Sequence, residues 1–186
     1  PVTGASAAES DFQMNGTTLV SYTGTESSVS VPSTVKEIGD GAFADNKDIT
    51  KVTIGTGTKR IGYSAFSDNT ALSKVTIGSS AEEIGTAAFA NCYSVTDISV
   101  GSSVKTLGTG VFTGCEKLKT VSFDTGNKAF VCADGAIYNS DKTVLYEVLP
   151  GKEGSSFTVP DTVKAIDSYA FYGCSHLTDV VLGGNT

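Results

Sequence analysis

The segment KEIGDGAFADN at residues 36–46 returns three times, as KRIGYSAFSDN at 59–69, EEIGTAAFANC at 82–92 and KTLGTGVFTGC at 105–115. The step between copies is 23 residues throughout the stretch from Val35 to Phe123. The recurring positions include the phenylalanines Phe43, Phe66, Phe89 and Phe112, the apolar residues Ile38, Ile61, Ile84 and Leu107, and the glycines Gly39, Gly62, Gly85 and Gly108. A fixed period of about 20 to 50 residues is typical of a solenoid.

Each repeat also contains a segment with strand character, which lies between one copy of the quoted segment and the next. Residues 49–54, ITKVTI, are rich in β-branched side chains, and their alternation directs Val52 and Ile54 inward. A second, shorter extended piece ends at Ile38 or its equivalents, and Gly39 to Phe43 predicts one tight helical or 3-10 turn. Because each coil exposes an apolar flank that only the next coil can bury, the repeats are expected to form a stack.

A fifth copy follows an interruption and carries Ile166, Ala170, Phe171, Leu177, Val180 and Leu182. Within the interruption, residues 136–138 and 144–148 are predicted strands, joined by a polar turn at residues 139–142. The following SSFTVPDTVKAI at 155–166 matches SSVSVPSTVKEI at 27–38, and residues 11–32 also contain a hairpin signal, Asn15-Gly16. The N-terminal hairpin and the interruption are therefore interpreted as two copies of one unit.

These boundaries predict a disordered tail at residues 1–10 and a single domain at residues 11–186. Within the domain we expect a hairpin cap at 11–32, repeats at 33–123, a hairpin insertion at 124–159 and a final repeat at 160–186. The chain stops directly after a strand, which exposes a sheet edge and an apolar coil face. We therefore expect either a longer native protein or an end that is covered by a partner, which could be a second copy.

Composition limits the classes of function. The net charge of -7 and the scattered 13 Lys and Arg residues argue against a nucleic-acid partner. The sequence has no run of about 18 apolar residues, so membrane insertion is not expected. It also lacks a signal peptide at Pro1, and the small polar residues that follow suit a mature or trimmed N-terminus.

The cysteines follow the repeat and do not form a disulfide pattern. Cys92, Cys115 and Cys174 each lie three residues after a repeat phenylalanine, where the first two copies have Asn46 and Asn69. Side chains in register point the same way, whereas a disulfide needs Cβ atoms about 3.8 Å apart. We expect buried free thiols that behave as small apolar residues. No set of ligands suits a metal, and no cofactor is expected.

The chain resembles the BspA-like leucine-rich repeat family, a group found largely on bacterial cell surfaces. The family unit is close to L-x-x-V-x-I-P-x-x-V-x-x-I-G-x-x-A-F-x-x-C. The residues that match it are Leu118, Val121 and Phe123 in the strand, Ile84, Gly85, Ala88, Phe89 and Cys92 in the turn, and Asp134 to Tyr138 with Pro150 to Lys152 in the insertion. Asp167 departs from the pattern because it occupies the position of the repeat glycine.

The resemblance implies a leucine-rich-repeat solenoid, an α/β-type right-handed superhelix rich in β structure. Such a solenoid would carry a parallel β-sheet on one face, short helical or 3-10 turns and two β-hairpin units. It also implies an exported, non-catalytic protein, often part of a longer chain and sometimes associated with adhesion. The family has no fixed functional residues that could be transferred to this sequence.

The strongest candidate binding surface is the outward face of the sheet. Strand alternation places ten residues on that face. They are Lys51, Thr53, Lys74, Thr76, Asp97, Ser99, Thr120, Ser122, Asp179 and Val181. Solenoids commonly bind through such a face, but a soluble sheet needs the same polar residues on its wet side, and the face lacks aromatic anchors. A second candidate is the hairpin aromatic set Tyr22, Phe130, Tyr138 and Tyr146, which either forms a platform or covers the coil ends.

No candidate for catalysis stands out. The single histidine, His176, occupies a position that holds Asp48, Ala71, Ser94 or Lys117 in the other copies, so we interpret it as a solvent-facing spacer. The acidic loops at 45–48 and 124–127 lack the ligand spacing of an EF-hand loop. Glycine-rich stretches such as residues 55–57 lack the lysine and helix of a phosphate-binding loop.

The sequence therefore predicts a non-enzymatic extracellular binding module at a bacterial cell surface. Its partner would be a protein or a glycan, as for an adhesin. The alternative is a structural spacer or stalk segment of a larger surface protein, with no ligand of its own.

Overall fold

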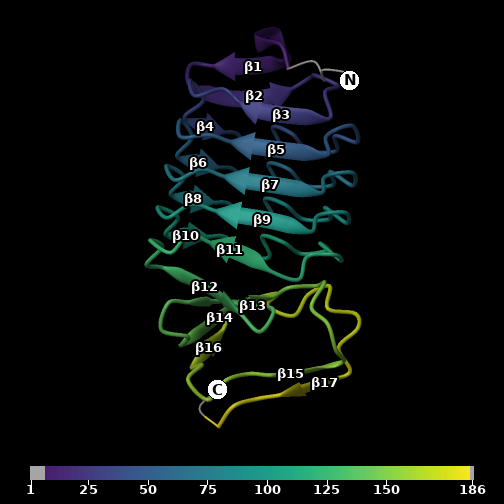
Figure 1. Cartoon of the computed structure of the whole chain (residues 1–186), viewed down its shortest axis with the longest axis vertical. Coiled ribbons are helices and arrows are strands. Elements are labelled where there is room, and N and C mark those ends of the chain that lie inside the picture. The colour runs from purple at the N-terminus through teal and green to yellow at the C-terminus, as the bar shows by residue number, and fades with distance from the viewer. Residues whose placement is uncertain (1–6, 185–186) are drawn as a thin grey trace.

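A computed structural model describes residues 7–184 of the chain. Their regular structure consists of short strands and one 3-10 helix, η1 (Glu9–Asp11). Figure 1 shows the coils stacked as an almost straight column, with the N-terminal and C-terminal ends at opposite ends of the column. The predicted β-rich repeat solenoid is confirmed. Within the described residues, no helix is long and apolar enough to cross a membrane.

Two parallel sheets run along the column, where the sequence predicted a sheet on one face. The long-strand sheet contains β3 (Ser28–Val31), β5 (Lys51–Ile54), β7 (Lys74–Ile77), β9 (Asp97–Val100) and β11 (Val121–Phe123). The parallel strands β4 (Glu37–Ile38), β6 (Arg60–Ile61), β8 (Glu83–Ile84) and β10 (Thr106–Leu107) form the short-strand sheet, which the N-terminal hairpin extends at one edge. Each coil therefore contributes one strand to each sheet, because the short extended piece before the glycine also pairs with its neighbours.

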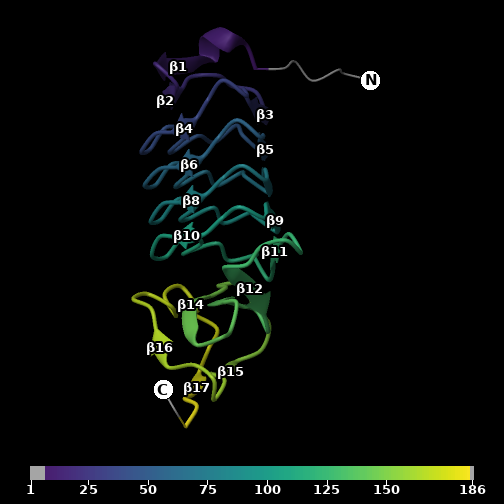
Figure 2. The ribbon, with the colours of Figure 1, turned by 90° about the vertical axis from the view of Figure 1, so that its left-hand side faces the viewer.

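The segment after each short strand is a hydrogen-bonded turn, where a helical or 3-10 turn was expected. Ala42 N donates to Gly39 O at 3.2 Å, but Phe43 N donates to Ala65 O in the next coil at 2.8 Å. Alternate amides are thus used between coils, and a helix would need all of them within the segment. In Figure 2 these turns project from one side of the column. We call this side, formed by residues 39–46, 62–69, 85–92, 108–115 and 167–174, the turn face.

The repeat phenylalanines form a stacked column in the core. Neighbouring ring centroids are 4.6 Å apart for Phe43 and Phe66, 5.1 Å for Phe66 and Phe89, and 5.9 Å for Phe89 and Phe112. All four rings are buried. The recurring side chains of the sequence are therefore the inner lining of the coils, as predicted.

The N-terminal hairpin pairs β1 (Phe12–Asn15) with β2 (Thr18–Tyr22). Its two-residue loop is Gly16-Thr17, one residue later than expected, because Asn15 pairs with Thr18 and only Gly16 has a positive φ, +61°. A glycine at the first loop position suits a type II′ turn.

The predicted tail also ends earlier than residue 10. Glu9 and Ser10 belong to η1, where Asp11 N donates to Ala8 O at 3.0 Å and the Asp11 carboxylate accepts from Ala8 N at 2.8 Å. The rest of the tail up to residue 6 lies outside the described residues.

The insertion contains three antiparallel strands, where the sequence predicted two. They are β12 (Phe130–Ala133), β13 (Ala136–Asn139) and β14 (Val144–Val148). The strand that was missed, β12, joins β13 through Asp134 and Gly135, which have φ values of +52° and +73°. Positive φ at both loop residues is the requirement of a type I′ turn, for which Asp-Gly is a preferred pair.

Strand β13 divides the hydrophobic core. Ile137 packs with the core of the first four repeats, whereas Ala136 and Tyr138 pack with a second cluster that contains Phe157 and Ala170. Alternate side chains of a strand point to opposite sides. The insertion therefore covers the end of the first stack with one face and begins the second stack with the other.

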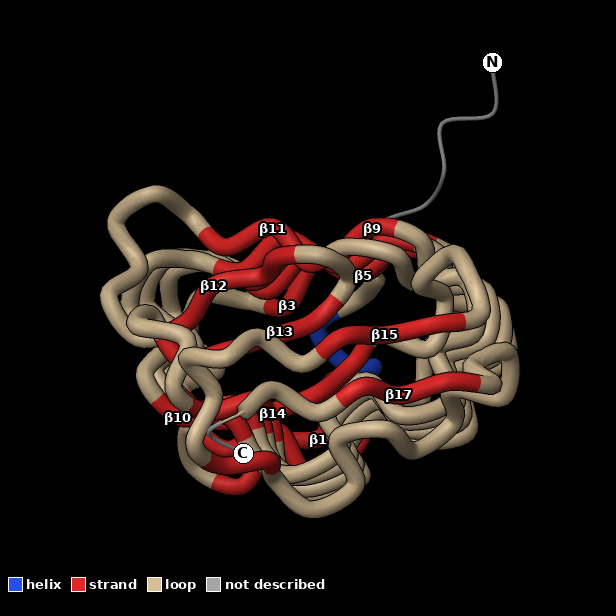
Figure 3. Tube along the Cα trace, turned by 90° about the horizontal axis from the view of Figure 1, so that it is seen from below, coloured by secondary structure: helices blue, strands red, loops and turns tan. Residues whose placement is uncertain are grey.

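The second unit repeats the connections of the first. Strand β14 pairs with β16 (Ala165–Ile166) as β2 pairs with β4, and β15 (Ser156–Thr158) pairs with β17 (Asp179–Val181) as β3 pairs with β5. The predicted duplication of one unit is thus confirmed. Figure 3, viewed from the C-terminal end, shows β15 and β17 offset from the strands of the long-strand sheet.

Candidate functional site

The long-strand sheet presents an in-register polar face. Lys51 pairs with Lys74, which pairs with Asp97 on the next strand. A second column contains hydroxyl side chains only, running through Ser30, Thr53, Thr76, Ser99 and Ser122. Because neighbouring strands lie about 4.8 Å apart, the hydroxyl groups form a continuous stripe along the column axis.

The structure brings together eight of the ten residues predicted for this face. Six lie on β5, β7 and β9, Ser122 lies on β11, and Thr120 directly precedes β11. Asp179 and Val181 do not join them. They are exposed on β17, which belongs to a separate two-stranded sheet. The sequence placed them on the same face because the fifth repeat has the same pattern, but the insertion separates the two sheets.

The C-terminal end of this face is hollowed. A depression of about 550 Å³ lies between β11, the loop at residues 124–127 and β12, and Thr120 and Ser122 line it with Phe123 and Cys132. Burial raises the pKa of the Cys132 thiol above its ordinary value, so the thiol is protonated at neutral pH. The hollow exists because β12 turns away from the direction that a further regular coil would follow.

Charged residues of neighbouring coils pair across the short-strand sheet. Glu82 accepts from Lys105 at 2.6 Å and from Lys59 at 2.9 Å, and these two hydrogen bonds lower the pKa of Glu82 to about 2. Arg60 in the same way contacts Glu37 and Glu83. These charges satisfy one another between coils and leave little isolated charge for a ligand.

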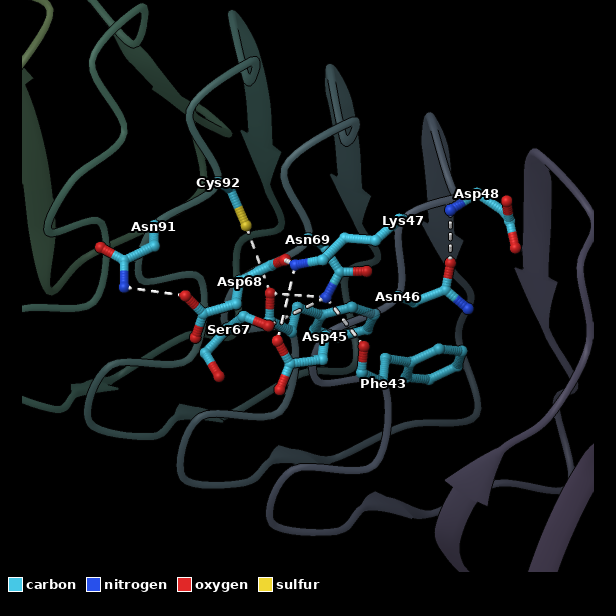
Figure 4. Close-up of polar contacts among 11 residues, drawn as sticks. Phe43, Asp45, Asn46, Lys47, Asp48, Ser67, Asp68, Asn69, Asn91 and Cys92 are labelled. Carbon is cyan, nitrogen blue, oxygen red and sulfur yellow. Dashed lines mark hydrogen bonds and ion pairs between the residues drawn. The ribbon is translucent and has the colours of Figure 1, made fainter.

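The position three residues after the repeat phenylalanine forms an internal hydrogen-bonded column, part of which is drawn in Figure 4. Asn69 Nδ2 donates to Phe43 O at 2.8 Å, and Cys92 Sγ donates to Phe66 O at 3.2 Å. Cys115 repeats the contact with Phe89 O at 3.2 Å. All four cysteines are free. The buried-thiol interpretation agrees with the structure, with the addition that the thiols act as donors to the backbone.

Glu147 is a buried carboxylate that the sequence did not single out. It lies on β14 at the joint between the stacks, and both of its oxygens accept from Phe112 N at 3.1 Å. The corresponding amide of Phe89 donates instead to Val111 O of the next regular coil. Burial raises the pKa of Glu147 to about 8. Glu147 thus replaces the backbone carbonyl that is missing where the regular repeat stops.

The hairpin aromatics do not form a platform. Tyr22, Phe130 and Tyr138 are buried and Tyr146 is half-buried. Tyr22 packs on Phe43 with ring centroids 5.0 Å apart, and Phe130 packs on Tyr146 at 5.3 Å. The alternative interpretation, that these rings cover the ends of the coils, is the correct one.

The exposed aromatic side chains lie on or next to the turn face, and the sequence analysis missed them. They are Tyr63, Tyr93, Tyr169 and Tyr172. Tyr169 and Tyr172 contact each other with ring centroids 5.8 Å apart. Their signal in the sequence is a departure from the repeat, because the other copies carry small residues such as Gly41 and Ala44 at the positions of Tyr169 and Tyr172.

His176 is not the solvent-facing spacer that we expected. Its side chain is partly buried, and its Nε2 atom is buried without a hydrogen-bond partner among residues 7–184. Asp48 and Lys117 at the equivalent positions are exposed. In the part of the chain that the structure describes, no three His, Cys, Asp or Glu side chains gather in a metal-binding group.

Comparison with known families gives one match. The model described as the BspA type leucine rich repeat region matches residues 19–143 and 148–186, in six copies. These ranges include all the regular repeats and most of the insertion. No curated protein matches the chain.

Several solved structures share the fold. The pneumococcal vaccine antigen PcpA is 29% identical, with 86% of this chain and 45% of that chain covered and a TM-score of 0.73. A leucine-rich repeat protein from Eubacterium ventriosum is 25% identical over 91% of this chain and 54% of that chain, with a TM-score of 0.70. The T. pallidum leucine rich repeat protein, 21% identical over 98% and 83%, has a TM-score of 0.68 and shares the fold. The chain spans about half the length of the first two.

Proposed function

Because the chain belongs to the BspA-type leucine-rich repeat family, we propose that it is a non-enzymatic module that binds a protein or a glycan at a bacterial cell surface. The proposal depends on one observation above all. The recurring side chains are buried, which leaves the residues at the surface free to vary from coil to coil. Variation of this kind suits recognition through an extended surface.

The cell-surface part of the proposal has separate support. One structural relative is a pneumococcal vaccine antigen, and another is a leucine-rich repeat protein of Eubacterium ventriosum. The whole relatives are about twice as long as this chain, so the module would act as part of a larger assembly of repeats or domains.

The polar face of the long-strand sheet remains our first candidate for protein contact. Its strands are in register, and its hydroxyl groups, exposed at Ser99 and Ser122 and half-buried at Thr53 and Thr76, can donate and accept hydrogen bonds. Its C-terminal hollow gives it one concave region, where Thr120 and Ser122 border apolar side chains. A surface that mixes apolar side chains with hydrogen-bonding groups is typical of non-obligate interfaces.

The test is binding of the purified chain to host matrix proteins and to a glycan array. The variant Thr53/Thr76/Ser99/Ser122→Lys fills the hydroxyl stripe with long side chains that point away from the core. A matched control, Ser33/Thr56/Ser79/Ser103→Lys, adds the same charge at exposed positions outside the strands. We expect the first variant to lose binding of a protein ligand and the control to keep it.

Two outcomes would contradict these proposals. Equal binding by both variants removes the sheet face from consideration. Binding of no protein and no glycan by the unmodified chain favours the alternative function, a spacer that holds another part of the protein away from the cell.

A further inference from the structure

A groove of about 650 Å³ crosses the turn face where the fourth and fifth repeats meet. Its floor is made of small residues, among them Ala87, Ala90 and Gly110, and its ends carry the rings of Tyr63, Tyr169 and Tyr172. This volume lies in the range of about 300–1,000 Å³ that is usual for ligand sites. The groove is separate from the polar face of the long-strand sheet, which the proposed function uses.

The groove depends on the way the insertion joins the two stacks. A Cβ atom at Gly173 of the fifth repeat would lie 3.3 Å from the backbone nitrogen of Gly114 in the fourth repeat. Turns that are far apart in sequence thus lie directly against each other. The hairpin of the insertion contributes Glu147, which accepts from Phe112 N where the first stack ends. The Tyr169 and Tyr172 rings therefore stand beside the floor of small residues.

The three tyrosine rings have no structural task in the core. Tyr63, Tyr169 and Tyr172 are 56%, 65% and 58% exposed. Large apolar surfaces that gather around a concave region mark interaction sites. Tyrosine suits such a site because its ring offers an apolar face and its hydroxyl offers a hydrogen bond.

Tyr169 is also held in an unfavourable backbone conformation. Its φ is +63°, in the left-handed region, where a bulky side chain is a rare outlier. The same turn position is filled by small residues in the other copies, by Gly41, Ser64, Ala87 and Gly110. Backbone strain of this kind clusters at functional sites. A tyrosine here costs stability and gives the core nothing, which indicates that its exposed ring is used.

The chemistry of the lining selects the ligand. Of the described residues that line the groove, none carries a charge at neutral pH. An ion entering it would lose hydration without gaining an opposite charge. Hydroxyl groups of Thr86, Thr109 and Ser168 lie among the rings and offer uncharged hydrogen-bond partners.

Part of the backbone at the floor is already paired. Ser64 N donates to Thr86 O at 3.0 Å, and Ala87 N donates to Thr109 O at 3.1 Å. An extended peptide that binds by strand addition needs unpaired backbone groups at a sheet edge. These paired groups disfavour that mode, and the ligand must be held by ring faces and side-chain hydroxyls.

We infer that this tyrosine groove binds a neutral saccharide chain. A neutral sugar presents C–H faces that pack on rings and hydroxyl groups that pair with Thr and Ser. The inference rests on the proposed function as a binding module but names a ligand class and a surface of its own.

The test is calorimetric titration of the whole chain with neutral hexasaccharides of glucose, mannose, galactose and xylose. We expect at least one to bind, and its affinity to fall about tenfold in Tyr172→Ala, the change produced by loss of one good aromatic contact. Tyr169→Gly should weaken binding similarly while raising the melting temperature or leaving it unchanged, because glycine accepts the positive φ. Tyr93→Ala removes an exposed ring outside the groove and should bind normally.

Three results would overturn the inference. The first is that no neutral hexasaccharide binds, and the second is that binding survives both groove substitutions. The third is that a proline-rich peptide, and no saccharide, binds through the same rings. If matrix proteins still bind in any of these cases, the proposed function stands and only the groove assignment fails.

Discussion

At the scale of single residues, Asn69, Cys92 and Cys115 show how one repeat position tolerates different side chains. Each donates a hydrogen bond to the carbonyl of the phenylalanine one coil earlier. The conserved property is therefore a small buried donor, which both an amide and a thiol supply. A buried carbonyl left without a donor would cost about 1–3 kcal/mol.

The Asn69 position gives a direct test. Asn69 Nδ2 also donates to Phe66 O at 2.8 Å, which accepts from Cys92 Sγ as well, so Asn69→Ala removes the side-chain donor of Phe43 O and one of the two donors of Phe66 O. We expect Asn69→Ala to lower the free energy of unfolding by about 1–3 kcal/mol and Asn69→Cys by less than half of that. Urea denaturation followed by circular dichroism measures both values. Equal losses would show that packing, and not the donated hydrogen bond, is what matters here.

Glu147 makes the stability of the protein depend on pH. Burial raises its pKa from an ordinary 4.5 to about 8 in the folded state. Below pH 4.5 both folded and unfolded states hold the proton, so this carboxyl does not oppose folding. As the pH rises from 4.5 to 8, the unfolded state releases the proton first, and the folded state loses stability relative to it.

We therefore expect the free energy of unfolding to fall by a few kcal/mol between about pH 5 and pH 8 and then to level off. Denaturant titrations at pH 5, 7 and 9 measure the change. Glu147→Gln removes the ionisable group but keeps an oxygen for Phe112 N, so its profile should be flatter across this range. A wild-type profile as flat as that of the variant would refute the burial of this carboxyl.

At the scale of elements, the separation of successive coils is set by glycines where two backbones touch. A Cβ atom at Gly108 would lie 2.1 Å from Thr86 N, which is far closer than atoms can approach. Gly108 and Gly55 each directly follow a strand. A Cβ atom at Gly55, however, would lie 3.9 Å from its nearest atom, Val31 O. Only the first glycine is required for the stacking.

Gly108→Ala is expected to destabilise the fold by about 1–3 kcal/mol or more, because the coil must move away from its neighbour. Gly55→Ala should be neutral or slightly stabilising, since alanine restricts the unfolded chain. Thermal denaturation of the two variants compares them directly. A similar melting temperature for both would mean that the coils separate without cost.

At the scale of the whole molecule, the column consists of two stacks that differ in the size of the buried core and in the number of neighbours that their strands have. The first core extends from Phe12 to Leu149, and its inner strands, such as β5, β7 and β9, have neighbours on both sides. The second core is smaller, and β17 at its end has all three side chains exposed and a single partner, β15. Segments with fewer buried contacts need less free energy to open locally.

Hydrogen exchange should report this gradient. In the 186-residue chain, we expect the amides of β15 and β17 to exchange faster than those of β7, which lies between β5 and β9. Mass spectrometry of peptic fragments resolves these segments. Protection of β17 equal to that of β7 would indicate that something covers the C-terminal coil, such as a second copy of the chain.

The polar face and the tyrosine groove also differ at this scale. The face lies within one sheet, so its eight residues could be found from strand alternation. The groove joins Tyr63 and Tyr169, which are 106 residues apart in the sequence. A surface of this second kind arises only when distant coils are brought together.

The sequence by itself determined the solenoid, the inward side chains and the duplicated hairpin unit. These depend on a pattern that recurs every 23 residues, so each copy confirms the others. The irregular arrangement where the first stack meets the insertion was decided only by the tertiary structure. Strand β12 lies under β11 only because the stack ends there, and Glu147 is buried because an amide of a distant coil needs an acceptor. No periodic pattern encodes such contacts, since each forms once.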